Sequence, residues 1–227
     1  MDIVYVIQAR TSSSRLPAKV LLPLNRIPIA VLAAKRAANS GVKTLVVTST
    51  EKTDDYLCEV LERNEIVYFR GSLADTLGRF VLALEDYKDD TIVVRLTADN
   101  VIPDGPFIAE VVNEFINSKY KYLSTTGEST GLPYGLSAEV MHLNSLREAN
   151  LVSKDSFDRE HVTPYIKRKY VGNTYNNLSY LNLAKLRCTI DTLDDFLYMA
   201  RIMLEVDDVI NESALNIINI MKEKGRG

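Results

Sequence analysis

Three cations lie within ten residues near the N-terminus of the chain, at Arg10, Arg15 and Lys19. The residues between them are mostly small hydroxyl residues, and none is a glycine. Fixed cations, hydroxyls and free backbone N–H groups are what proteins use to bind a polyphosphate. The segment therefore predicts a loop that binds a nucleoside triphosphate. The nucleotide-binding residues expected in this loop are Gln8, Ala9, Arg10, Ser12, Ser13 and Ser14.

This loop differs from two familiar phosphate-binding patterns. A Walker A motif requires G-x-x-x-x-G-K-[ST] and a Rossmann fingerprint requires G-x-G-x-x-G, whereas the loop has no glycine. Arg15 and Lys19 flank Leu16 and Pro17, where they would neutralise the β- and γ-phosphates, and we predict both to be catalytic. A solvated connection is the alternative interpretation, but two cations directly after an apolar run favour phosphate binding.

Two aspartates follow apolar runs and are candidates for a metal site. Asp99 comes after residues 92–96, and Asp191 comes after residues 185–190. Carboxylate oxygens are the ligands that Mg²⁺ prefers, so we predict that Asp99 and Asp191 share one Mg²⁺ ion. Each aspartate also fits a simpler role as the cap of a turn or helix, and that alternative stays open.

The elements that must position these side chains alternate between strands and helices in the first half. Apolar runs predict strands at residues 2–8, 44–49, 66–69 and 91–96, and helical patterns lie between them at 28–40, 54–64 and 75–88. This alternation predicts βαβ units and a parallel sheet. Ligands bind beyond the carboxyl ends of such strands, so the loop after Gln8 and the turn around Asp99 are expected to meet.

The second half of the chain is less regular. A turn-rich break at residues 131–135 precedes an apolar run at 136–141 and helical patterns at 143–152 and 158–169. A strand is expected at 185–190, followed by amphipathic helices at 193–205 and 214–222. We predict a single domain over residues 1–227, in which residues 131–180 form a lid, sugar-side or dimerisation subregion.

Composition narrows the possible partners and the location. The chain has 227 residues and a net charge of −3, and its cations are interspersed with acidic residues, which argues against nucleic acid as a partner. Cys58 and Cys188 are far apart and lack metal-ligand spacing, so we expect reduced thiols and a cytoplasmic protein. No apolar run approaches the ~20 residues of a membrane span, so no membrane association is expected.

Several segments in the same order resemble one known family. The opening loop reads Q-A-R-T-S-S-S-R-L-P-A-K-V-L, and further matches are R-G-S at 70–72, R-L-T-A-D at 95–99, G-L-S-A-E-V at 135–140, D-R-E-H-V-T-P-Y-I at 158–166 and R-C-T-I-D-T at 187–192. Together they are similar to the SpsF type of cytidylyltransferase. Its relatives make CMP-activated acidic sugars.

The resemblance implies an α/β, Rossmann-like nucleotidyltransferase fold related to GT-A, with three α/β/α layers and a mostly parallel sheet. It implies CTP as donor, Mg²⁺ as cofactor at Asp99 and Asp191, and an acidic or amino sugar as substrate. The product is a CMP- or CDP-sugar for surface polysaccharide, formed with release of pyrophosphate. A homodimer is a further implied possibility. The family positions match Arg70, Gly71, Ser72 and Thr97 for the nucleotide, and Glu139, Arg159, Glu160 and His161 for the substrate.

Some interpretations remain alternatives. Arg79 faces the triphosphate or pairs with Asp75 four residues earlier, and His161 binds substrate or has a structural role. The chain has Ser12, Ala18 and Ala98 where the family usually has glycine. A GT-A-like glycosyltransferase and a degenerate, non-catalytic nucleotide-binding module are the two competing functions.

Overall fold

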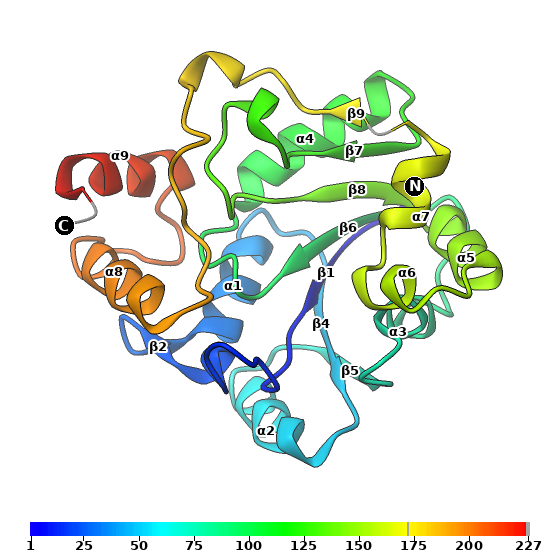
Figure 1. Ribbon diagram of the computed structural model, residues 1–227, viewed down its shortest axis with the longest axis horizontal. Coiled ribbons are helices and arrows are strands. Elements are labelled where there is room, and N and C mark those ends of the chain that lie inside the picture. The colour runs from blue at the N-terminus through cyan, green and yellow to red at the C-terminus, as the bar shows by residue number, and fades with distance from the viewer. Residues whose placement is uncertain (172, 226–227) are drawn as a thin grey trace.

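The computed structural model describes residues 1–171 and 173–225 and shows a seven-stranded sheet between two layers of helices (Figure 1). The strands are β1 (Ile3–Gln8), β4 (Thr44–Ser49), β5 (Tyr68–Gly71), β6 (Ile92–Thr97), β7 (Tyr122–Ser124), β8 (Glu139–His142) and β9 (Asn173–Thr174). Their order is β5-β4-β1-β6-β8-β7-β9. The four strands β5, β4, β1 and β6 are parallel, β8 is antiparallel to both β6 and β7, and β9 is parallel to β7. The predicted α/β fold with a mostly parallel sheet is confirmed.

Alternation along β1 explains why the sheet is covered on both faces. Tyr5 and Ile7 pack into one hydrophobic cluster, while Val4 and Val6 pack into another on the opposite face. Successive side chains of a strand point to opposite faces, so a strand that is apolar at every position must be buried on both sides. The β-branched residues of β1 therefore call for a layer of helices on each face.

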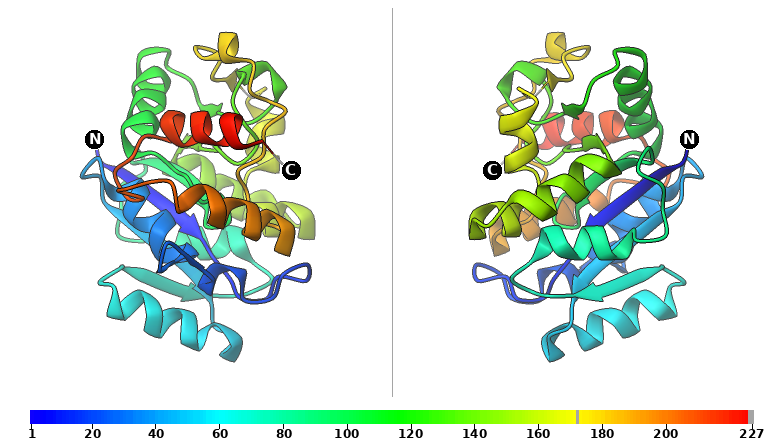
Figure 2. Two further views of the ribbon diagram at one scale, coloured as in Figure 1. Left: turned by 90° about the vertical axis from the view of Figure 1, so that its left-hand side faces the viewer. Right: turned by 90° about the vertical axis from the view of Figure 1, so that its right-hand side faces the viewer.

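The helices meet this requirement. The first cluster packs α1 (Ile29–Ala38), α2 (Asp55–Arg63) and α4 (Gly105–Asn117) on one face. The second cluster packs α3 (Thr76–Ala83), α5 (Leu143–Val152) and α7 (Pro164–Lys169) on the other, with α6 (Ser156–His161) just before α7. The side views in Figure 2 show these helices on either side of the strands.

A third cluster closes one side of the molecule with α8 (Leu193–Met203) and α9 (Ala214–Lys224), drawn in orange and red in Figure 1. These helices pack toward the small hairpin of β2 (Pro23–Leu24) and β3 (Ile27–Pro28). Helix α8 begins with a capping box, in which Thr192 and Asp195 each accept from the other's backbone N–H. The buried Arg36 of α1 ties this region to the main sheet by donating to the carbonyl oxygens of Pro103, Val209 and Glu212.

Several predicted elements need correction. The expected strand at 185–190 is wrong, because this segment makes only isolated bridges, Arg187 with Tyr134 and Thr189 with Asn100. Its alternating pattern arises because Cys188 and Ile190 are buried in the third cluster. The expected helix at 158–169 is two short helices, since Val162 adopts a positive φ of 70° between α6 and α7.

Other differences concern the bounds of elements. The strand expected at 66–69 lies at Tyr68–Gly71, and the helix expected at 75–88 ends at Ala83. Strand β7 and helix α4 were not predicted from the sequence. Helix α4 nevertheless has two clear start signals, an N-cap at Asp104, whose carboxylate accepts from Phe107 N, and Pro106 in the first turn. Within the described ranges, no helix has both the length and the apolar character needed to cross a membrane.

Residues 131–180, the predicted lid, sugar-side or dimerisation subregion, contribute to the sheet and to one layer of helices. Strands β8 and β9 of this segment belong to the central sheet, and α5 and α7 cover one of its faces; residue 172 lies outside the described chain. Both cysteines, Cys58 and Cys188, are buried free thiols.

Candidate active site

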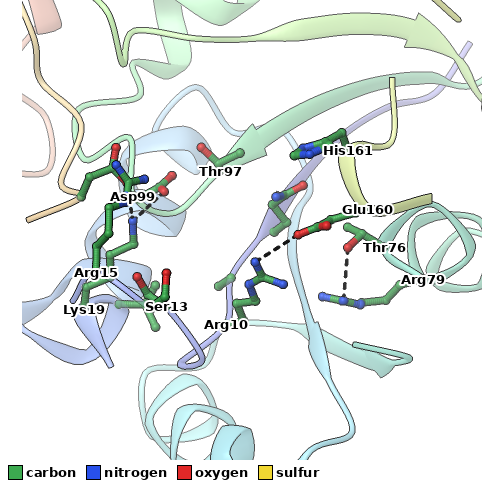
Figure 3. Close-up of a pocket in the computed structure, with 15 residues that line it drawn as sticks. Arg10, Ser13, Arg15, Lys19, Thr76, Arg79, Thr97, Asp99, Glu160 and His161 are labelled. Carbon is green, nitrogen blue, oxygen red and sulfur yellow. Dashed lines mark hydrogen bonds and ion pairs between the residues drawn. The ribbon is translucent and has the colours of Figure 1, made fainter. Parts of the chain in front are cut away.

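A pocket of about 240 Å³ opens at the carboxyl ends of β1 and β6. From β1 the chain first builds β4 and β5 on one side, then returns to β6 on the other side of β1. This reversal leaves a crevice between the strand ends, which is where open α/β sheets bind ligands. The pocket is lined by Gln8, Ala9, Arg10, Ser13, Ser14, Arg15, Lys19, Val20, Thr76, Arg79, Thr97, Asp99, Glu160, His161 and Asp191. Figure 3 shows this site.

The start of the cation-rich loop is fixed by a buried carboxylate. Asp54 Oδ1 accepts from the backbone N and the hydroxyl of Thr11, at 2.8 and 2.6 Å. Its Oδ2 accepts from Thr48 Oγ1 at 3.1 Å and from both N and Oγ of Ser49. Burial alone would raise the pKa of Asp54, but these hydrogen bonds outweigh it and lower the pKa. Asp54 thus holds the loop against the end of β4.

The far end of the loop turns through Ala18. Its φ of 57° and ψ of 20° are left-handed, and its N–H donates to the carbonyl oxygen of Thr11 at 2.8 Å. Ser12 and Ala98 are not among the described residues with positive φ. Of the three replacements of family glycines, Ala18 is therefore the one that needs the left-handed conformation. The turn leads into a short 3₁₀ helix (Lys19–Leu21), whose first side chain enters the pocket.

Lys19 lies between the two predicted metal ligands. Its Nζ is 2.9 Å from Asp99 Oδ2, 3.0 Å from Asp191 Oδ1 and 2.7 Å from the carbonyl oxygen of Ile190. Arg15 Nη2 lies 2.7 Å from Asp191 Oδ1, and Arg187 Nη2 contacts Asp191 Oδ2. Burial favours a higher pKa for Asp191, but Lys19 and the two arginines outweigh it and lower the pKa. The carboxylate of Asp191 is therefore held in its charged form at neutral pH.

The opposite side of the pocket carries a second group of charges, seen on the right of Figure 3. Arg10 Nη2 lies 3.4 Å from Glu160 Oε1. Arg79 is 2% exposed and donates to the carbonyl oxygen of Ser72 from Nε and Nη2, at 3.1 and 2.8 Å. Burial, with repulsion from Arg10, lowers the pKa of Arg79. The exposed His161 lines the pocket and packs on Phe157 with ring centroids 4.4 Å apart.

Thr76 lines the pocket but was not a predicted site residue, and Arg79, for which the sequence left two roles open, lines it as well. Of these two alternatives, the ion pair of Arg79 with Asp75 is not the arrangement found. Asp75 caps α3 by accepting from Gly78 N at 2.8 Å, and its other oxygen contacts Arg159. The signal in the sequence was its spacing, because Arg79 follows Asp75 by four residues and so lies one turn into the helix.

Most predicted site residues come together in this pocket, but six lie outside it. Those that line it are Gln8, Ala9, Arg10, Ser13, Ser14, Arg15, Lys19, Thr97, Asp99, Glu160, His161 and Asp191. Those that do not are Ser12, Arg70, Gly71, Ser72, Glu139 and Arg159. Arg70 instead joins β5 to β4 and α2, because its Nε donates to Ser49 O at 2.9 Å and its Nη2 pairs with Asp55 at 2.7 Å.

Glu139 lies in the core rather than on the pocket surface. Glu139 is 4% exposed. Its Oε1 accepts from Tyr122 at 2.5 Å, from Thr163 at 3.0 Å and from Lys167 at 2.6 Å. Its Oε2 contacts Arg95. Burial works against the charge, but Arg95 and Lys167 lower the pKa of Glu139 to about 2. A sequence pattern cannot distinguish such a buried carboxylate from one that faces a ligand.

The two pocket aspartates fit the ligand set of a magnesium ion bound with a nucleotide. One oxygen of each carboxylate already lies within 3.0 Å of a single cationic atom, Lys19 Nζ. Mg²⁺ is usually held by one or two carboxylates, while phosphate oxygens and waters complete its shell. The described residues contain no cluster of three or more His, Cys, Asp or Glu side chains that could hold a metal ion.

The chain is a nucleotidyltransferase, and its mostly parallel sheet, with a cation-rich loop and an aspartate pair at the carboxyl edge, suits that class. More narrowly, it belongs to the cytidylyltransferase family, whose model matches residues 4–207. It is 33% identical to an uncharacterised protein of Methanocaldococcus jannaschii, over 97% of this chain and 90% of that one. It is 28% identical to the spore coat polysaccharide biosynthesis protein SpsF of Bacillus subtilis, over 97% of this chain and 94% of SpsF.

Solved structures agree with this assignment. A cytidylyltransferase from Leptospira borgpetersenii matches with a TM-score of 0.90 and 28% identity, covering 99% of this chain and 95% of that chain. A CMP:2-keto-3-deoxy-manno-octonic acid synthetase, solved in complex with CTP, matches with a TM-score of 0.68 and 14% identity, covering 90% of this chain and 99% of that one. The second likeness concerns the fold alone.

Proposed function

We propose that this nucleotidyltransferase uses CTP and Mg²⁺ to convert an acidic or amino sugar into a CMP- or CDP-sugar for surface polysaccharide, with release of pyrophosphate. The observation that carries the proposal is the joint presence, in one pocket, of the loop cations and the Asp99–Asp191 pair. Membership of the cytidylyltransferase family supports CTP as donor. The acidic sugar is the substrate class in the name of the CMP:2-keto-3-deoxy-manno-octonic acid synthetase that shares this fold, and it is carried over to this chain as part of the proposal.

The chemistry requires positioning and charge stabilisation. An oxygen of the sugar attacks the α-phosphorus of CTP, the bond from that phosphorus to the bridging oxygen breaks, and pyrophosphate leaves with the bonding electrons. In the proposed arrangement, Arg15 and Lys19 contact the β- and γ-phosphates and stabilise the charge that develops on the leaving group. Ser13 and Ser14 line the same wall of the pocket. No side chain forms a covalent bond in this scheme.

Asp99 and Asp191 would hold the magnesium ion, which supplies charge neutralisation at the phosphates when bound. On the opposite side of the pocket, Arg10, Glu160 and His161 are placed to contact the sugar. A cationic group such as Arg10 is suited to an acidic sugar, and a carboxylate such as Glu160 is suited to an amino sugar. These residues therefore define the part of the pocket in which to look for sugar specificity.

Thermal unfolding with nucleotides tests the donor. A ligand that binds the native state raises the unfolding midpoint, so CTP with Mg²⁺ should raise it more than UTP, ATP or GTP with Mg²⁺.

Pyrophosphate release from CTP with a panel of acidic and amino sugars then tests the reaction. A glycosyltransferase would instead release a nucleoside phosphate from a nucleotide sugar, and a binding module would show the shift in midpoint without any release.

A further inference from the structure

Lys19 has no spare hydrogen-bond donor in this structure. An ammonium group has three N–H donors. Asp99 Oδ2, Asp191 Oδ1 and the carbonyl oxygen of Ile190 lie 2.9, 3.0 and 2.7 Å from Nζ and use all three. The side chain is only 9% exposed, so the three contacts are largely shielded from water. Lys19 must therefore give up at least one of these contacts before it donates to a phosphate.

The position of Nζ is also the position that a shared cation would take. Each aspartate places one oxygen on Nζ from a different segment, Asp99 from the turn after β6 and Asp191 from the segment before α8. The point between the two carboxylates is therefore filled by the ammonium group as long as Lys19 stays there. A lysine side chain is a compact charge on a flexible four-carbon stem, which suits it to leave and return.

The charges around Lys19 also disfavour the binding of a free divalent cation. Asp99 and Asp191 contribute two negative charges, and Lys19, Arg15 and Arg187 contribute three positive charges, a sum of +1. Arg187 Nε also lies 3.5 Å from Asp195 Oδ1, and including this carboxylate brings the group to zero. A divalent cation added to this balanced group would leave an uncompensated charge of +2, whereas a cation that arrives with a triphosphate brings compensating negative charge.

We propose that Lys19 acts as a placeholder for the divalent cation. Its ammonium occupies the site between Asp99 and Asp191 in the nucleotide-free protein and excludes free metal. A bound triphosphate offers Lys19 new acceptors, and its departure opens the site. Metal and nucleotide consequently bind together, and metal alone binds poorly. This inference rests on the proposed function, in which the aspartate pair takes a metal ion with CTP.

The test measures binding of Mn²⁺ alone, without nucleotide, by the loss of the EPR signal of free Mn²⁺. Lys19→Met removes the ammonium and keeps a flexible apolar chain of similar length. We expect Lys19→Met to bind Mn²⁺ at least tenfold more tightly than the wild type, and Lys19→Met with Asp99→Asn to lose this gain. Unchanged Mn²⁺ binding in Lys19→Met would overturn the proposal.

Arg15→Met is the matched control. It removes one positive charge beside Asp191 but leaves the ammonium between the two carboxylates. Equal tightening of Mn²⁺ binding in Arg15→Met and Lys19→Met would show a general effect of charge and would overturn the placeholder role. Lys19→Gln is a second neutral variant, and circular dichroism of each variant establishes that it is folded before the titration.

Failure of this inference is distinguishable from failure of the proposed function. If the wild type is stabilised by CTP with Mg²⁺ while Lys19→Met gains no Mn²⁺ affinity, the placeholder role alone is wrong. If the wild type shows no stabilisation by any triphosphate while Lys19→Met gains Mn²⁺ affinity, Lys19 excludes metal from the pair but the proposed donor is wrong.

Discussion

Individual side chains in the pocket compete for the same partners. Asp191 contacts Lys19, Arg15 and Arg187, so each of these cations is partly neutralised before a ligand arrives. On the other side of the pocket, Arg79 is held by carbonyl oxygens and Arg10 by a 3.4 Å contact with the exposed Glu160. The effect of each substitution therefore depends on which contacts the residue already makes.

Substituting the central residues should remove catalysis while the fold persists. We expect Lys19→Ala and Asp99→Asn each to lower the rate of pyrophosphate release from CTP by about 10²-fold or more, as is typical for loss of a group that stabilises developing charge. Lys224→Ala is the control. Lys224 lies at the end of α9 and forms an exposed ion pair with Glu205, and neither residue lines the pocket. A variant with an unchanged rate would have no part in the mechanism.

Asp54 does not line the pocket but fixes the start of the loop through its hydrogen bonds with Thr11. In Asp54→Asn, one oxygen becomes an NH₂ donor that faces the N–H and hydroxyl donors of Thr11 or Ser49. We expect stability to fall by about 1–3 kcal/mol for the unsatisfied buried group, with a larger rise in KM for CTP than fall in kcat. Urea unfolding and steady-state kinetics measure both quantities. Glu59→Gln, on the exposed face of α2, should change neither, and a purely structural role for Asp54 would leave KM unaltered.

At the level of the loop, one turn stores backbone strain. Ala18 has a left-handed backbone with φ 57°, a conformation that costs roughly 1–2 kcal/mol for a residue with a Cβ. Glycine removes this cost but loses about 0.4–1 kcal/mol through greater freedom of the unfolded chain. Ala18→Gly should therefore stabilise the protein by about 0.5–1 kcal/mol, measured by urea unfolding. Ala98→Gly, where φ is not positive, should be destabilising, and the opposite order would contradict this account.

Two strands and a helix are joined at Glu139, which connects β8 to Arg95 of β6 and to Lys167 of α7. These cations lower the pKa of Glu139 from 4.5 to about 2. A carboxylate whose pKa is depressed in the folded state stabilises that state fully above its unfolded pKa, and this stabilisation is lost as pH falls through the folded pKa.

The resulting pH dependence is testable. Between about pH 4.5 and pH 2 we expect the wild type to lose about 3 kcal/mol of stability on account of Glu139. Glu139→Gln should have a lower free energy of unfolding at pH 7 and a shallower decline in this window, since other carboxylates titrate equally in both proteins. Urea unfolding at a series of pH values measures the two slopes, and parallel curves would refute the assignment.

Over the molecule as a whole, the pocket is assembled from parts that the chain order keeps apart. Arg10 and Lys19 come from one loop, Asp99 from the turn after β6, Glu160 from α6 and Asp191 from the segment before α8. The region that carries α8 and α9 must therefore be held firmly against the sheet. Arg36 does this from α1, fully buried, and burial lowers its pKa to about 10, which still leaves it charged at neutral pH.

Removing that connection should weaken the whole fold. Arg36→Met keeps much of the volume but leaves the carbonyl oxygens of Pro103, Val209 and Glu212 without their donor. We expect a loss of about 2–5 kcal/mol in the free energy of unfolding, typical of a broken buried hydrogen-bond network. Arg63→Met, which removes an exposed arginine paired with Glu59 on α2, should cost within about 0.5 kcal/mol. Similar losses in both variants would show that Arg36 is not a tie of this kind.

The sequence by itself determined the alternation of elements, the position of the cation-rich loop and the family. Apolar runs such as residues 3–7 and 92–96 can only be buried as inner strands, and the loop cations and Asp99 follow those runs directly. Local pattern therefore located the carboxyl edge of the sheet and the residues on it. Ordered matches along the chain were specific enough to identify a cytidylyltransferase, and the family model confirmed it.

Only the tertiary structure decided which charged residues face the pocket and which support it. Glu139 and Glu160 both lie in segments that match the family, yet Glu139 is enclosed by Arg95 and Lys167 while Glu160 lines the pocket. Likewise, Asp75 contacts Arg159, 84 residues away in the sequence, and Arg79 lines the pocket without an ion pair to Asp75. Such ion pairs depend on distances between segments remote in sequence, and those distances are set by packing rather than by any local pattern.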